Sequence, residues 1–193
     1  WPEAKLEGMV ITRYGHGLPT KLIQVIEAGH PVPDEAGLNG AKETLRLIRT
    51  LQPGDQLIAL ISGGGSSLLT LPAADLSIQD LQITTQALLM SGAPIGQMNI
   101  VRKHLSAILG GHMAREAASR GAKVDAFLIS DVTGDHPSSI ASGPCAPDES
   151  TFADALQILK DYDLLQGQIP KVVTDYLQNG LSGKNPETPK SGD

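Results

Sequence analysis

The sequence predicts an α/β fold with a Rossmann-like, mostly parallel sheet and helices on both faces. Short apolar, partly β-branched runs alternate with segments of helical periodicity along the chain. Residues 57–61 are continuously apolar between turn signals, which is typical of a strand buried on both faces of a parallel sheet. A chain of 193 residues has room for one such domain.

The first strands are expected at residues 8–12 and 22–26, and the segment between them is too short for a helical crossover. The Gly- and Pro-rich turn at 29–33 ends the second strand. A helix follows over 34–51, because Asp34 offers an N-cap and apolar residues recur at helical spacing.

The middle of the chain adds the strand at 57–61 and three helices. Ser77 and Asp80 have the spacing of a capping box, which predicts a helix ending near Ser91. The next helix is expected over 97–109, and the glycines that follow either kink it or separate it from a helix over 112–119.

The last third is expected to hold a strand at 124–129 and two helices. Ser150 caps the first of these helices, and Pro170 begins the second, which Asn179 and Gly180 close. We therefore divide the chain into a Rossmann-like domain at 1–180, incomplete at its N-terminus, and a flexible tail at 181–193. With three or four strands the sheet is under-covered, and strands upstream of Trp1 would explain this.

Composition limits the function classes. The net charge of −6 argues against nucleic acid or an anionic membrane as the main partner. No apolar run is long enough to span a membrane. The single cysteine, Cys145, has no partner for an internal disulfide, which favours a reducing, cytoplasmic setting.

A glycine- and serine-rich loop follows the buried strand at 57–61. Its six residues are Ser62, Gly63, Gly64, Gly65, Ser66 and Ser67. Consecutive glycines let backbone N–H groups approach an anion, and the hydroxyls add donors, so we predict a phosphate- or substrate-binding loop. The alternative is a tight strand-to-helix turn. The loop matches neither a P-loop nor a dinucleotide-binding fingerprint, so a nicotinamide cofactor is poorly supported.

A second loop, at 130–136, follows the strand at 124–129. Its carboxylates Asp131 and Asp135 are candidate ligands for Mg²⁺ beside a phosphate, although both are also ordinary turn residues. Since ligands of open α/β sheets bind beyond the carboxyl ends of the strands, both loops are expected to converge on one pocket.

A third candidate is the polar face of the helix over 97–109, formed by Asn99, Arg102, Lys103 and Ser106. Arg102 and Lys103 would attract a carboxylate or phosphate, and the alternative is a solvated helix face. We expect His104, at the margin of the apolar face, to be a packed structural histidine. Cys145 has no base partner in the sequence pattern that would make it a nucleophile.

Four motifs, at 29–37, 60–69, 99–106 and 130–144, together resemble the class II glycerate 2-kinase family. Some members of that family carried the older name hydroxypyruvate reductase. The resemblance implies transfer of a phosphoryl group from ATP, with Mg²⁺, to the 2-hydroxyl of D-glycerate, which yields 2-phosphoglycerate.

The family's chains are roughly twice this length, and the resemblance covers only their N-terminal, Rossmann-like domain. The Lys and Arg proposed as catalytic in the family lie outside this chain, so no catalytic residue is carried over and the isolated chain is expected to be weakly active or inactive. The family pattern also leads us to expect a basic residue where this sequence has Leu109. Which loop takes the nucleotide and which takes glycerate stays open.

Two other function classes compete with the kinase. One is an NAD(P)H-dependent hydroxypyruvate reductase, motivated by the family's older name. The other is a non-catalytic module that binds anions or forms a homodimer through apolar surface left exposed.

Overall fold

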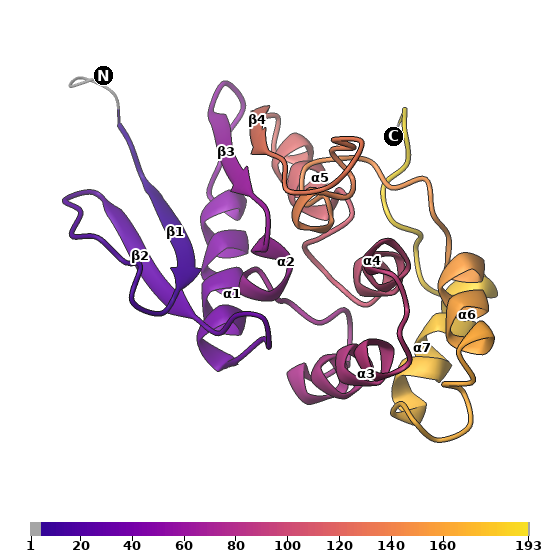
Figure 1. Cartoon of the computed structure of the whole chain (residues 1–193). Coiled ribbons are helices and arrows are strands. Elements are labelled where there is room, and N and C mark those ends of the chain that lie inside the picture. The colour runs from indigo at the N-terminus through magenta and orange to yellow at the C-terminus, as the bar shows by residue number, and fades with distance from the viewer. Residues whose placement is uncertain (1–4, 193) are drawn as a thin grey trace.

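The computed structural model describes residues 5–192 and has the α/β architecture that the sequence predicts (Figure 1). Residues 1–4 and 193 of the predicted domain and tail lie outside the described residues. The strands are β1 (Gly8–Arg13), β2 (Ile23–Ala28), β3 (Gln56–Ser62) and β4 (Lys123–Ile129). The helices are α1 (Glu35–Arg49), α2 (Gly65–Leu68), α3 (Ile78–Met90), α4 (Ile95–His104), α5 (His112–Ser119), α6 (Phe152–Asp161) and α7 (Lys171–Leu181), with a 3₁₀ turn at Ile140–Ser142.

All strand pairing in the described residues is parallel, in two separate two-stranded sheets, β1–β2 and β3–β4. The connection between β1 and β2 contains no helix, as its length requires, yet the two strands still pair in parallel.

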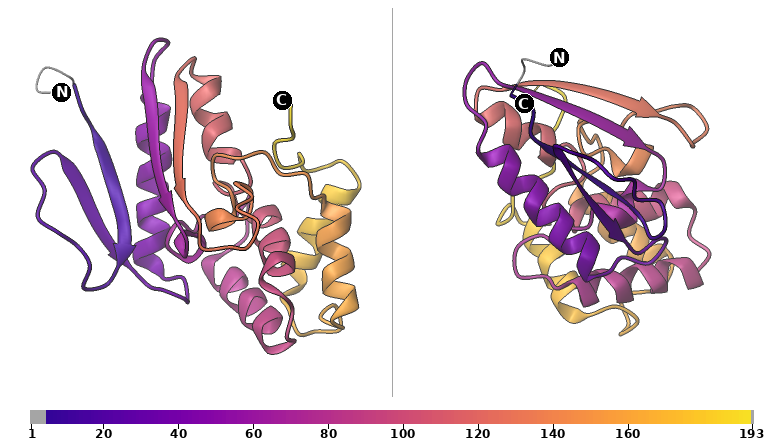
Figure 2. Two further views of the ribbon diagram at one scale, coloured as in Figure 1. Left: turned by 45° about the horizontal axis from the view of Figure 1, so that its top comes forward. Right: turned by 90° about the vertical axis from the view of Figure 1, so that its left-hand side faces the viewer.

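Helices cover one side of the β3–β4 pair. Helix α1 packs on β1 and β2, α5 packs on β4, and Figure 2 shows both helices on the same side of the strands. A cluster of small and branched apolar side chains, including Ala41, Ile48, Ala59 and Ile108, fills this interface.

The opposite face of β3–β4 is uncovered, which corrects two predictions: that helices lie on both faces of the sheet, and that the strand at 57–61 is buried on both faces. Leu60 is 79% exposed, and its register partner Phe127 is 62% exposed. Ile58 and Ile129 on the same face are exposed as well, because no helix of residues 5–192 packs there.

A second core joins α3, α4, α6 and α7 beside the strands (Figure 1). Phe152, Leu88 and Leu159 are among its fully buried side chains. The capping box predicted at Ser77 and Asp80 is present and begins α3.

Three helix boundaries differ from the sequence-based expectation. The N-cap of α6 is Thr151, not Ser150, because Thr151 and Asp154 form a reciprocal capping box. Gly180 lies inside α7 and does not end it. Helix α4 ends at His104, well before 109, because the chain turns there and Ser106 forms a bridge with Pro72.

The predicted flexible tail packs against the domain between Asn185 and Lys190. The Glu187 carboxylate accepts hydrogen bonds from the Phe152 amide at 2.8 Å and pairs with His104 Nε2 at 3.2 Å. Thr188 is 3% exposed, and its hydroxyl donates to Asp148 at 3.1 Å. The polar residues of this segment form hydrogen bonds with buried groups of the domain, and a polar composition does not predict such bonds. None of the helices in the described part of the chain has the length and apolar character to cross a membrane.

Candidate functional site

The two predicted loops meet at the carboxyl ends of β3 and β4. The carboxylate of Asp131 lies against Gly63 so closely that a β-carbon on Gly63 would stand 1.9 Å from Asp131 Cγ. Gly63 is not in a left-handed conformation, so the contact with Asp131, and not backbone strain, requires glycine there. The predicted convergence of the glycine loop and the acidic loop is therefore observed.

Two physical reasons require the residue at position 64 to be glycine. Its φ of +79° is in the left-handed region that favours glycine, and it forms the N-cap of α2. In addition, a β-carbon on Gly64 would stand 2.9 Å from Nε2 of His30, in the turn after β2. His30 thus lies beside the glycine loop.

A strained turn packs behind the glycine loop. Ala141, Ser142 and Gly143 all have positive φ, between 49° and 57°, and a β-carbon on Gly65 would stand 2.9 Å from Cβ of Ala141. The Ser142 side chain is fully buried, and its hydroxyl shares a 2.8 Å hydrogen bond with that of Ser66. Left-handed non-glycine residues cost energy, and they persist only where the surrounding structure holds them.

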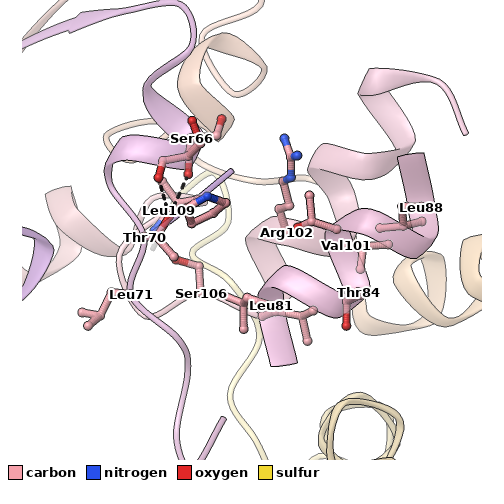
Figure 3. Close-up of a pocket in the computed structure, with 14 residues that line it drawn as sticks. Ser66, Thr70, Leu71, Leu81, Thr84, Leu88, Val101, Arg102, Ser106 and Leu109 are labelled. Carbon is pink, nitrogen blue, oxygen red and sulfur yellow. Dashed lines mark hydrogen bonds between the residues drawn. The ribbon is translucent and has the colours of Figure 1, made fainter. Parts of the chain in front are cut away.

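A pocket opens between α2, α3 and α4, and Figure 3 shows it in close-up. Ser66 and Ser67 line it from the glycine loop, and Arg102 lines it from α4. The remaining wall is mostly apolar, with Leu81, Leu88, Val101 and Leu105 among its residues. The structure therefore brings Ser66, Ser67 and Arg102 to one pocket, whereas Ser62 and the three glycines of the loop are not among its lining residues.

Lys103 does not join this pocket, which corrects its assignment as a phosphate- or substrate-binding residue. Its ammonium group forms a 2.6 Å ion pair with Asp148, and both side chains are buried, at 7% and 1% exposure. Burial alone would raise the pKa of Asp148, but hydrogen bonds from Lys103 and Ser150 and the lysine charge outweigh it and lower that pKa. Arg102 lines the pocket, whereas Lys103 is held by Asp148, so the two adjacent cations have different partners.

Asn99 and Ser106 do not form a solvated face either. Both are buried, and the Ser106 hydroxyl accepts hydrogen bonds from the amides of Ile108 and Leu109. His104 is the packed histidine that the sequence predicts. It is 2% exposed, and its ring packs edge-on against that of Phe152 with the ring centroids 5.0 Å apart.

Asp131 and Asp135 lie on the same exposed loop. Asp135 has a left-handed φ of 50°, which fits its alternative role as a turn residue. Among residues 5–192, no three His, Cys, Asp or Glu side chains gather in a cluster that could hold a metal ion by themselves. A cation held at this loop would need further ligand oxygens from water or from a bound molecule.

Sequence reasoning missed two residues of this region. Asp148 was not singled out, because its partner Lys103 is 45 positions away and no spacing rule links them. Ser142 lies in the motif at 130–144, but nothing in the sequence pointed to its bond with Ser66, 76 positions away.

These features define a class of protein. It is an α/β domain that presents a glycine- and hydroxyl-rich loop and a carboxylate at the carboxyl ends of parallel strands, with an arginine of α4 in the adjoining pocket. Residues 1–178 match the family model described as "Domain of unknown function (DUF4147)", so the chain belongs to this family.

Curated relatives carry two kinds of name. The chain is 45% identical over 184 residues to a glycerate 2-kinase of Pyrococcus horikoshii, covering 95% of this chain and 41% of the relative. It is 47% identical over 193 residues to a protein of Agrobacterium vitis with the provisional name hydroxypyruvate reductase, covering 100% of this chain and 42% of the relative. The chain thus spans less than half the length of these relatives.

A solved structure from Pyrococcus horikoshii has the same fold. It superposes with a TM-score of 0.90 at 43% sequence identity, and the match covers 97% of this chain and 42% of the other. The family resemblance inferred from the four motifs and the predicted fold class are both confirmed.

Proposed function

We propose that the protein carrying this chain phosphorylates D-glycerate at its 2-hydroxyl with ATP. The 2-oxygen forms a bond to the γ-phosphorus while the bond from that phosphorus to the β,γ-bridging oxygen breaks. The hydroxyl proton is released to the solvent, and 2-phosphoglycerate and ADP are the other products. The name of the Pyrococcus horikoshii relative, a glycerate 2-kinase, supports this reaction for the family.

The contact between Gly63 and Asp131 is the observation that carries the proposal. It joins a loop with closely approachable backbone N–H groups to a carboxylate at one sheet edge. Phosphoryl transfer needs positioning, a cation that bridges phosphate oxygens and donors for the developing charge, with little covalent help from protein. Both kinds of group are available at this edge.

The residues have distinct roles in this proposal. The amides of Gly63, Gly64 and Gly65, with the flanking hydroxyls of the loop 62–67, bind an anion. Arg102 neutralises a second negative charge in the adjoining pocket. No residue of this chain is assigned as the proton acceptor.

Mg²⁺ fits the residues present when it is shared with the nucleotide. It usually keeps several waters and binds through one or two carboxylates together with substrate phosphates. Asp131 would hold it, with Asp135 on the same loop as the second candidate. Bound there, the cation would neutralise charge on the phosphate oxygens.

A hydroxypyruvate reductase that uses NAD(P)H is the second candidate, favoured by the name of the Agrobacterium vitis relative. It lacks support in the glycine loop, which has no dinucleotide-binding fingerprint. The proposal also includes a cytoplasmic setting. A homodimer through the exposed face of β3–β4 is a further prediction that light scattering tests.

The proposed reaction is tested by incubating the purified protein with D-glycerate, ATP and Mg²⁺. We expect ADP release that requires D-glycerate, with 2-phosphoglycerate identified by ³¹P NMR. Because the relatives are more than twice as long, we expect the 193 residues alone to turn over slowly. Oxidation of NADH or NADPH by hydroxypyruvate, without glycerate-dependent ADP release, would replace the kinase with the reductase.

A further inference from the structure

Arg102 is a cation without a charged partner in the described structure. Its side chain is partly buried, and its one side-chain hydrogen bond is a 3.5 Å contact with Asn99 Oδ1. No carboxylate between residues 5 and 192 forms an ion pair with it. Burial lowers the pKa of Arg102, so its surroundings penalise the positive charge without an anion to compensate.

Among the described residues that line the pocket, Arg102 is the one cation. The neighbouring cation, Lys103, is neutralised by its buried ion pair with Asp148 and does not line the pocket. A nucleoside triphosphate carries several negative charges, which need several cationic groups or a metal ion to neutralise them. One guanidinium, in contrast, matches the single charge of one carboxylate. The planar fork of arginine also matches the two oxygens of a carboxylate, with two parallel N–H donors.

The walls of the pocket favour a small organic acid. Leu81, Val101 and Leu105 make much of the lining apolar, which weakens screening and strengthens an ion pair made there. Figure 3 shows the Arg102 side chain extending toward the side of the pocket on which Ser66 lies. Arg102 and Ser66 therefore line the same pocket.

We propose that this pocket binds the carboxylate of the small 2-hydroxy acid, with Arg102 as its ion-pair partner, and that the phosphoryl donor binds at the Gly63–Asp131 junction. The identity of the acid rests on the proposed function. Ser66 connects the two subsites, because it lines the pocket and is bonded to Ser142 of the segment that follows the acidic loop. An acid held by its carboxylate at Arg102 would extend its hydroxyls toward the strand ends.

Calorimetric binding to the purified chain tests the proposal with three probes. These are D-glycerate, glycerol as a matched molecule without a carboxylate, and a non-hydrolysable ATP analogue with Mg²⁺. We expect the chain to bind D-glycerate and not glycerol. Arg102→Gln should weaken D-glycerate binding at least about tenfold, the effect of losing charge-assisted hydrogen bonds, and leave the ATP analogue unaffected.

Two further variants keep the test decisive. Arg46→Gln removes an equal charge from an exposed arginine of α1 that pairs with Glu43, and it should change neither affinity. Arg102→Lys keeps the positive charge but loses the two parallel N–H donors of the guanidinium, so it should weaken D-glycerate binding. This variant replaces Arg102→Gln in the experiment if Arg102→Gln does not fold. Weakened binding of the ATP analogue with unchanged D-glycerate binding would assign Arg102 to the nucleotide and overturn the proposal, as would a chain that does not bind D-glycerate.

The outcome is independent of whether the proposed reaction occurs. Arg102-dependent binding of D-glycerate without any phosphoryl transfer would support the subsite and contradict the kinase activity. Conversely, glycerate-dependent formation of 2-phosphoglycerate with an unchanged KM for glycerate in Arg102→Gln would support the kinase and reject the subsite.

Discussion

The Asp131 carboxylate occupies the space that a side chain on Gly63 would need. A β-carbon built on Gly63 would approach Asp131 Cγ and one carboxylate oxygen to 1.9 Å, far inside van der Waals contact. Two loops that follow different strands are therefore fitted to each other at one point, and the fit depends on the absence of a single side chain. The pairing of β3 with β4 in parallel register, Ser62 beside Ile129, brings the loops to that point.

Gly63→Ala should abolish the proposed nucleotide subsite without unfolding the domain. The added methyl must displace the Asp131 carboxylate, which is exposed and free to move into solvent. We expect the affinity for an ATP analogue with Mg²⁺ to fall to that of Asp131→Ala, with little change in the unfolding midpoint. Calorimetry and thermal denaturation measure the two quantities.

The double variant Gly63→Ala/Asp131→Ala controls this experiment. If the methyl acts only by moving the carboxylate, the two substitutions are not additive, and the double variant binds no worse than Asp131→Ala. Full additivity of the two losses would mean that Gly63 contributes separately from Asp131.

Asp148→Asn should destabilise the domain by about 3 kcal/mol, because it leaves the Lys103 charge buried without a counter-charge. Urea denaturation of the variant measures the loss. Asp175→Asn is the matched control. It breaks the exposed ion pair with Lys171, and such surface pairs contribute less than about 1 kcal/mol. Equal effects of the two substitutions would contradict the assignment of a buried pair.

The thiol of Cys145 should be almost unreactive while the domain is folded. Burial raises its pKa to about 12, and only the thiolate reacts with a disulfide reagent. At pH 8 we expect labelling by Ellman's reagent to be at least about a hundredfold slower than in denaturant. Rapid labelling of the folded chain would show that the thiol is accessible and ionised.

The part of the site that depends on strand ends could be predicted from the sequence. Parallel strands place their carboxyl ends at one edge, so the glycine loop after β3 and the acidic loop after β4 had to be neighbours. The four strands, the Ser77 capping box and the packed role of His104 follow from local pattern in the same way.

Partners brought together by chain turns could not be predicted. Lys103 and Arg102 are adjacent in sequence, and only the position of Asp148 in the folded chain separates their roles. The segment after α7 looked unstructured because its composition is polar. Glu187 and Thr188 nevertheless pack, since each finds a hydrogen-bonding partner in a distant part of the chain.

Stability should fall as the pH drops from about 6.5 toward 4, in part because of His112. Burial and the nearby positive charge of Arg115 lower its pKa to about 4, and Arg115 donates a 2.7 Å hydrogen bond to the unprotonated Nδ1. The unfolded chain takes up a proton near pH 6.5 and the folded chain does not, so protons favour unfolding in this window. The contribution is at most about 3 kcal/mol.

Denaturant unfolding of His112→Gln at several pH values between 6.5 and 4.5 measures this contribution. The variant should lose much of the pH dependence over that window while keeping similar stability at pH 7. An unchanged slope would mean that other groups carry the dependence.

Gly180→Ala and Gly96→Ala should change stability in opposite directions, although both replace a helical glycine. A β-carbon on Gly180 in α7 would lie 2.4 Å from the ring of Phe152, which is 2% exposed and has no room to withdraw. Overpacking of this kind costs about 1–3 kcal/mol. A β-carbon on Gly96 in α4 meets nothing within 4 Å, so alanine there should stabilise by about 0.5–1 kcal/mol through better helix propensity. The difference in unfolding free energy between the two variants isolates the contact with Phe152, and a stabilising Gly180→Ala would rule out the close packing of α7 on α6.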